Sequence, residues 1–133
     1  MGWIGELRDL ISWIGSRKKK EQKIANRKVS SISAPKVYND FQLYPNKHKY
    51  RDYKVKWHCD FMKLDSSLVF NQVHLNSSGV NIHSKVSLDN YPELKNEKEG
   101  KKYIITGIIE KTEKDGIYLS KLIELKEDTF FII

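Results

Sequence analysis

Apolar and polar residues alternate along residues 52–64, and this period of two is typical of a strand with one buried face. The apolar positions are Tyr53, Val55, Trp57, Cys59 and Phe61. The polar positions between them are Lys54, Lys56, His58 and Asp60. The pattern predicts a long first strand whose aromatic side chains point into a core.

Four further strands are predicted, over residues 68–75, 80–88, 102–111 and 117–125. Clusters of turn residues separate several of them, among them Asn76–Gly79 and the Asp115-Gly116 pair. Gly107 lies within the fourth predicted strand, and a glycine inside a strand usually marks a bulge or a bend. The sheet is therefore expected to curve.

A short helix is predicted between the third and fourth strands, over residues 89–100. Pro92 suits a first helical position, Glu93 follows it, and Gly100 suits a C-terminal cap. This order of three strands, a helix and two strands resembles the OB-fold family over residues 52–125. The run from Tyr103 to Ile109, followed by the Asp115-Gly116 turn and a last strand, resembles the two final barrel strands of that family. The resemblance implies a mainly β fold, a small OB-like five-stranded β-barrel.

An amphipathic N-terminal helix is predicted to precede the barrel. One face collects apolar residues at helical spacing; they are Trp3, Ile4, Leu7, Leu10, Ile11 and Ile14, with Trp13 at the edge. Three uses stay open for this face. It can pack on the barrel or on a second copy in a homo-oligomer, dock in a partner protein's groove, or lie on an anionic membrane surface.

A basic cluster of Arg17, Lys18, Lys19 and Lys20 follows this helix. The predicted organisation is an amphipathic and basic segment (1–28), a linker with an irregular lead-in (29–51) and the barrel with an apolar tail (52–133). The tail is expected to be a last strand or plug, with partner binding as its alternative. The basic run serves either as a solvated tether or as a phosphate contact.

The positive charge belongs to the front of the chain. The net charge is +7, yet residues 1–56 hold 14 Lys and Arg against 5 Asp and Glu. Residues 57–133 hold 10 against 12, so the barrel itself is slightly acidic. The basic pI is therefore no evidence that the barrel binds an anion.

The sequence predicts no catalytic, metal or cofactor site. Cys59 alternates with Trp57 and Phe61, which favours a buried thiol over a nucleophile. Adjacent on one strand, His58 and Cys59 point to opposite faces, and His74 with His83 lack a third ligand. No phosphate-binding glycine loop or nucleophile elbow is present. The single cysteine agrees with a reducing, cytoplasmic location, with peripheral membrane association left open.

The resemblance implies that a ligand lies on the outer face of the first three strands. Carried onto this chain, that face consists of Lys54, Lys56, His58, Phe70, His74, Asn81, His83 and Lys85. Lysines for phosphates and rings for bases predict a non-catalytic module for single-stranded DNA or RNA, to which residues 17–20 add affinity. The alternative is an adaptor whose N-terminal helix docks on a membrane or partner while the barrel binds protein.

Overall fold

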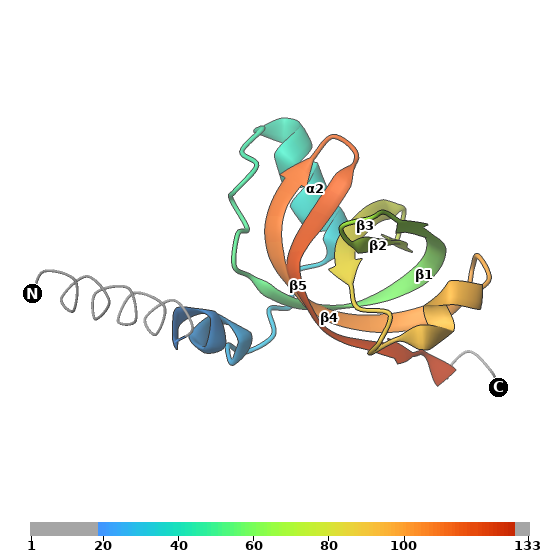
Figure 1. Ribbon diagram of the computed structural model, residues 1–133. Helices are drawn as coiled ribbons and strands as arrows, with labels where there is room; N and C mark the ends of the chain where they lie inside the picture. Colours follow the sequence, from blue (N-terminus) through green and yellow to red (C-terminus); the bar gives the residue numbers. More distant parts are fainter. Residues whose placement is uncertain (1–18, 130–133) are drawn as a thin grey trace, which may run out of the picture.

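The computed structural model describes residues 19–129, and its main elements are five strands (Figure 1). The strands are β1 (Lys54–Ser66), β2 (Asn71–Ser77), β3 (Val80–Val86), β4 (Lys102–Glu113) and β5 (Gly116–Glu127). They form a closed barrel in the order β1-β2-β3-β5-β4. The predicted fold class, a mainly β five-stranded barrel, is confirmed. The predicted helix over residues 1–14 and most of the apolar tail lie outside the described residues.

Closure of the barrel depends on β1 and on one parallel contact. The first half of β1, Lys54–Asp60, pairs with β4, and the second half, Asp60–Ser66, pairs with β2. All neighbouring strands run antiparallel except β3 and β5, which pair in parallel. A long first strand was predicted, and the structure confirms it: β1 pairs with both β4 and β2.

The barrel interior is filled by alternate residues of every strand. Val55, Trp57, Cys59 and Phe61 are buried, as the period of two in β1 predicts, whereas Tyr53 is 41% exposed although it was expected to point inward. Tyr53 instead packs edge-on against the Tyr50 ring. The side chains that are almost fully enclosed include Val73, Leu75, Ile82, Ile105, Ile109 and Ile117.

Gly107 marks a bulge, as predicted. The pairing of β4 with β5 shifts register between Thr106 and Gly107, and a Cβ at Gly107 would lie 2.8 Å from Leu119 Cδ1. Because the shift changes which side of β5 faces inward, Lys121 is exposed while Leu122 packs against the core. This explains why the polar Lys121 stands among the apolar residues of β5.

The segment predicted as an irregular lead-in contains a helix, α2 (Ala34–Leu43), so that prediction is wrong. The Ser33 side chain caps the helix by accepting a hydrogen bond from the Lys36 amide, and Pro35 lies in the first turn. Ser-Ala-Pro therefore begins a helix here, although it also suits a linker. Ala34 and Val37 are buried, and the Tyr38 hydroxyl donates to the Lys114 carbonyl at 2.6 Å. These contacts hold α2 beside the tip of the β4–β5 hairpin (Figure 1).

A second short helix, η1 (Pro92–Asn96), lies between β3 and β4, where one was predicted. It is a 3-10 helix, and its Leu94 side chain is 1% exposed and packs in the core. Residues 19–25 are also helical. Among residues 19–129, no helix is long and apolar enough to cross a membrane.

Asp40 connects α2 to the loop that follows it. Its carboxylate accepts hydrogen bonds from the Tyr50 hydroxyl, from Lys36 Nζ at 2.9 Å and from Lys49 Nζ at 3.4 Å. The Tyr50 bond, followed by the Lys36 bond, lowers the pKa of Asp40 from 3.8 to about 2.

We expect Asp40→Asn to lower the melting temperature above about pH 4, with the loss shrinking as the pH falls toward about 2. The folded-state pKa lies below the unfolded value, so the ionised carboxylate stabilises the fold above that value and this contribution disappears on protonation. Thermal unfolding followed by circular dichroism from about pH 2 to 7 measures this. The exposed Asp89→Asn is the matched control. A constant difference between Asp40→Asn and wild type across this range contradicts the prediction.

Candidate nucleic-acid interface

The structure divides the predicted ligand face into two parts. Phe70 and Lys85 come together, with Lys85 Nζ 4.7 Å from the centre of the Phe70 ring. His74 and His83 also meet, as directly opposed residues of β2 and β3. Lys54, Lys56 and His58, by contrast, lie on the half of β1 that pairs with β4.

The residues of the β4 side have different surroundings. The Lys54 ammonium donates to the Ala25 carbonyl at 2.7 Å, so it holds the end of the helix at residues 19–25 against the barrel. His58 is 70% exposed and its Nδ1 lies 2.8 Å from Asp128 Oδ2. Lys56 is exposed. Lys56 is therefore the exposed lysine of this part of β1, and the His58 imidazole is its one exposed ring.

Three predicted residues lie at other places and two are not described. Asn81 accepts a hydrogen bond from Asn76 Nδ2 at 3.2 Å beside the β2–β3 turn. Lys19 and Lys20 are exposed on the helix at residues 19–25. Arg17 and Lys18 lie outside the described residues.

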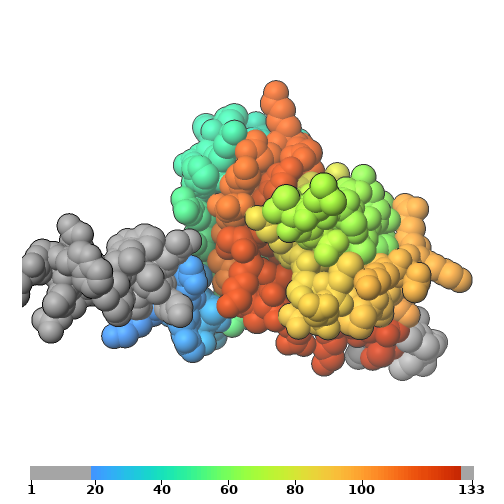
Figure 2. Space-filling model, in the orientation of Figure 1, coloured from blue at the N-terminus to red at the C-terminus, as the bar shows by residue number. Residues whose placement is uncertain are grey.

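The loop between β1 and β2 presents an aromatic ring on the surface. Ser67 organises the loop: its Oγ accepts from the Val69 and Phe70 amides and donates to the Phe70 carbonyl at 2.8 Å. Leu68 and Val69 at the tip are 107% and 87% exposed, and Phe70 is 41% exposed. Figure 2 shows the green end of β1 and this loop standing out beside the orange and red of β4 and β5.

A groove of about 250 Å³ runs from Phe70 toward β5. Two cations and two rings line it in pairs: Lys85 lies over Phe70, and Lys111 Nζ lies 5.2 Å from the centre of the Tyr118 ring. Lys111 and Tyr118 were not among the predicted site residues. They could have been found only by knowing that β3 and β5 pair in parallel, which places Tyr118 opposite His83.

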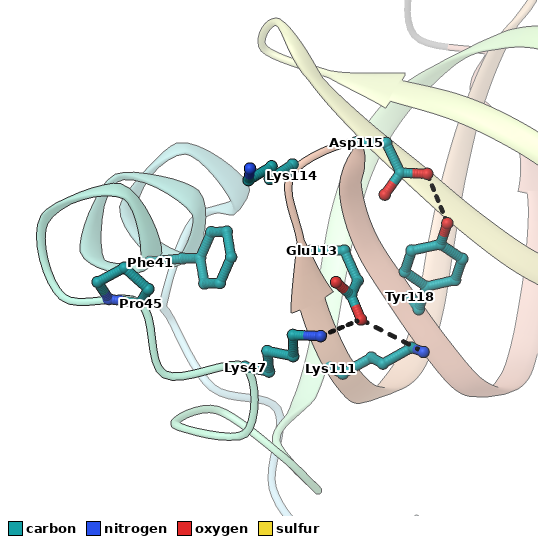
Figure 3. A pocket seen from close by; sticks show the side chains of 8 residues that line it. All are labelled: Phe41, Pro45, Lys47, Lys111, Glu113, Lys114, Asp115 and Tyr118. Atoms are coloured by element: carbon teal, nitrogen blue, oxygen red, sulfur yellow. Dashed lines mark hydrogen bonds and ion pairs between the residues drawn. The ribbon is translucent and has the colours of Figure 1, made fainter.

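Lys111 and Tyr118 also line a second hollow of about 550 Å³, between the end of α2 and the β4–β5 hairpin (Figure 3). Phe41 and Pro45 face the hairpin from the α2 side of this hollow. The two hollows share the Lys111 and Tyr118 side chains and therefore adjoin there; we call the two together the path from the β1–β2 loop to α2.

Acidic side chains contact Lys47, Lys111 and Tyr118 along this path. Glu113 Oε1 lies 3.2 Å from Lys47 Nζ and 3.5 Å from Lys111 Nζ, and these contacts, Lys47 first, lower the pKa of Glu113. The Tyr118 hydroxyl donates to Asp115 Oδ2 at 2.5 Å, which raises the pKa of Tyr118 to about 12. Tyr118 therefore stays a neutral ring at physiological pH, suited to stacking.

Chemistry at a thiol or a metal finds little support among the described residues. Cys59 is 3% exposed, and burial raises the pKa of its thiol to about 12, as expected for a core cysteine. Within residues 19–129, no three His, Cys, Asp or Glu side chains group so as to hold a metal ion.

Comparison with known proteins leaves the site to be judged on its own geometry. No protein-family model matches the sequence, and no curated protein matches it either.

Proposed function

We propose that the protein is a non-catalytic, OB-like module that binds single-stranded nucleic acid. The observation that carries this proposal is the pairing of cations with rings along one path: Lys85 over Phe70 and Lys111 over Tyr118. Single-strand sites combine aromatic platforms for bases with lysines for the backbone phosphates. Both are present here at neighbouring positions.

The position of the path supports the same reading. It lies between the β1–β2 loop and the β4–β5 hairpin, on the outer side of β3. In OB-folds, the face of strands two and three and these same two loops bind oligonucleotides. The closed five-stranded barrel is consistent with that family, and membership in it is part of the proposal.

The binding step follows from the geometry of each pair. A base that stacks on Phe70 displaces the Lys85 ammonium from the ring face, and the freed ammonium then reaches the phosphate of that nucleotide. Tyr118 and Lys111 do the same one position further along. Neither pair reads base edges, so little sequence preference is expected.

We expect Phe70→Ala to weaken binding of a single-stranded oligonucleotide by about five- to 150-fold, since a stacked base contributes about 1–3 kcal/mol. Phe70 is half exposed in a loop, so the fold should be unaffected. Fluorescence anisotropy with a labelled single strand, compared with the duplex, measures this. Leu68→Ala, an apolar residue of the same loop, is the matched control and should keep wild-type affinity.

Salt dependence separates this site from the general charge of the chain. The binding constant falls with salt concentration, and the slope of its logarithm against the logarithm of the salt concentration counts phosphate contacts. Lys85→Gln with Lys111→Gln should make this slope shallower by about 1.4, because each phosphate contact contributes about 0.7 on single strands. Lys56→Gln with Lys98→Gln, two exposed lysines outside the path, should leave the slope unchanged. Equal effects of the two double variants, or equal affinity for single strand and duplex, contradict the proposal.

A second candidate function rests on the tip of the β1–β2 loop. Leu68 and Val69 are almost fully exposed there, and exposed apolar side chains of this kind suit a protein contact. In this adaptor reading the N-terminal helix docks on a membrane or partner and the barrel binds protein. Loss of a partner with Leu68→Ala, together with wild-type oligonucleotide binding by Phe70→Ala, favours the adaptor.

A further inference from the structure

Two histidines face each other across the β2–β3 hairpin, beside the groove. His74 and His83 are directly opposed in the antiparallel register, and their Nδ1 atoms lie 2.7 Å apart. Their side chains are 15% and 11% exposed. His83 also lines the groove and packs on the Tyr118 ring at 4.8 Å between centres. A charge on this pair therefore acts on the proposed ligand path.

The Nε2 atom of each ring lies within hydrogen-bond distance of an oxygen. His83 Nε2 lies 2.9 Å from the Asp115 carbonyl oxygen, which can only accept a hydrogen bond. His74 Nε2 lies 2.7 Å from Asp65 Oδ2, and an ionised carboxylate likewise only accepts. Both Nε2 atoms therefore carry a hydrogen.

The contact between the two Nδ1 atoms depends on how many protons the two rings carry in total. A neutral imidazole carries one N–H, so two neutral rings with Nε2–H oppose two bare Nδ1 lone pairs at 2.7 Å, which repel. Two fully protonated rings oppose two N–H donors, which also repel. Only one added proton makes the contact an N–H···N hydrogen bond.

We propose that His74 and His83 share one proton between their Nδ1 atoms. The single positive charge beside the groove favours single-strand binding, which therefore weakens as rising pH removes that proton. The shared proton is inferred from this cluster alone, whereas its effect on single-strand binding rests on the proposed function.

Charged and titratable groups of β1, β5 and the β4–β5 hairpin lie around the pair, and Lys85, Glu110 and Lys111 line the same groove as His83. β1 supplies Asp65, with Lys63 Nζ 3.7 Å from it, and the β4–β5 hairpin supplies the Asp115 carboxylate, 3.8 Å from His83 Nε2. β5 contributes Tyr118, whose hydroxyl is held by Asp115. Burial lowers the pKa of His74, and the bond to Asp65 opposes that effect.

Removal of the shared proton acts on the groove in two ways. The charge beneath the phosphates disappears, and the two lone pairs push the rings apart. Since Tyr118 packs on His83 and β3 lies beside β5, the stacking platform shifts with the ring.

The first arm of the test is NMR of the free wild-type protein. Long-range ¹⁵N–¹H spectra of the imidazoles, recorded from about pH 5.5 to 9, report which nitrogens carry hydrogen. We expect hydrogen on both Nε2 atoms throughout, and one shared titration step at the two Nδ1 atoms. Two independent full titrations, or a bare Nε2 on His83, overturn the proposal.

The second arm measures oligonucleotide affinity over the same pH range at constant ionic strength. Wild-type affinity should fall about three- to tenfold across the step seen by NMR, the size expected for one nearby, partly screened charge. His74→Gln should abolish that dependence, and the exposed His58→Gln should keep it. If NMR shows the shared proton but the oligonucleotide affinity does not change with pH, the proposed effect of this proton on binding is overturned. If no oligonucleotide binds at all, the proposed function fails, and the NMR arm alone decides the shared proton.

Discussion

Gly116→Ala should destabilise the barrel by about 3 kcal/mol or more, because the new methyl group meets a backbone that cannot move away. A Cβ at Gly116 would lie 2.2 Å from the Asn81 carbonyl oxygen and 2.9 Å from its carbon. That carbonyl belongs to β3, immediately before the residues that pair with β5. The clash therefore falls on the parallel contact that closes the barrel.

Gly100→Ala is the matched control for this substitution. Gly100 has a φ of +91° and Gly116 a φ of +134°, so alanine is strained at both positions. A Cβ at Gly100, however, meets no atom within 4 Å. We expect only about 1–2 kcal/mol there, the cost of the backbone conformation alone. Chemical denaturation followed by circular dichroism gives both free energies of unfolding, and equal losses at the two glycines would show that packing against Asn81 is unimportant.

Trp57→Ala should cost about 3–5 kcal/mol of the free energy of unfolding, as large truncations of core aromatic residues do. Trp57 is 6% exposed in the barrel, and its Nε1 donates to the Ile32 carbonyl at 2.9 Å. The side chain thus fills the core and also fastens the segment that leads into α2. Small domains have only about 5–15 kcal/mol in total, so the variant should be close to unfolding.

Trp57→Phe separates the two roles of this residue. Phenylalanine keeps a buried ring but leaves the Ile32 carbonyl without its donor, which costs about 1–3 kcal/mol. Urea denaturation monitored by circular dichroism compares the three proteins, since substitution removes the fluorescence of the Trp57 indole. A loss below about 1 kcal/mol for Trp57→Ala would contradict the inferred packing.

Local patterns were sufficient to predict most of the barrel. The period of two in β1, the Asn76–Gly79 and Asp115-Gly116 turns and the glycine at the β4 bulge each depend on residues close in the chain. α2 was missed because Ser33-Ala34-Pro35 suits a linker as well as a helix start, and the packing of Val37 decides between them.

The candidate site was only half predictable for a different reason. Phe70 immediately precedes β2 and Lys85 lies on β3. These strands are joined by a tight turn and Gln72 pairs with Lys85, so period two places Phe70 and Lys85 on one face. Tyr118 joins them through the parallel β3–β5 contact, which no local pattern reveals. Lys54, Lys56 and His58 were predicted on the same face because local patterns do not reveal which strands are neighbours. In the structure they lie beside β4.

The hydrogen bonds of the β1–β2 loop have a consequence for how this surface can change. Ser67 bonds to Val69 and Phe70 within its own loop, so the loop is braced from inside and does not take part in the closure of the barrel. Lengthening such a loop costs little, about 0.6 kcal/mol for each doubling of its length. Insertions after Leu68 can therefore alter what the surface contacts while the barrel that carries it stays the same.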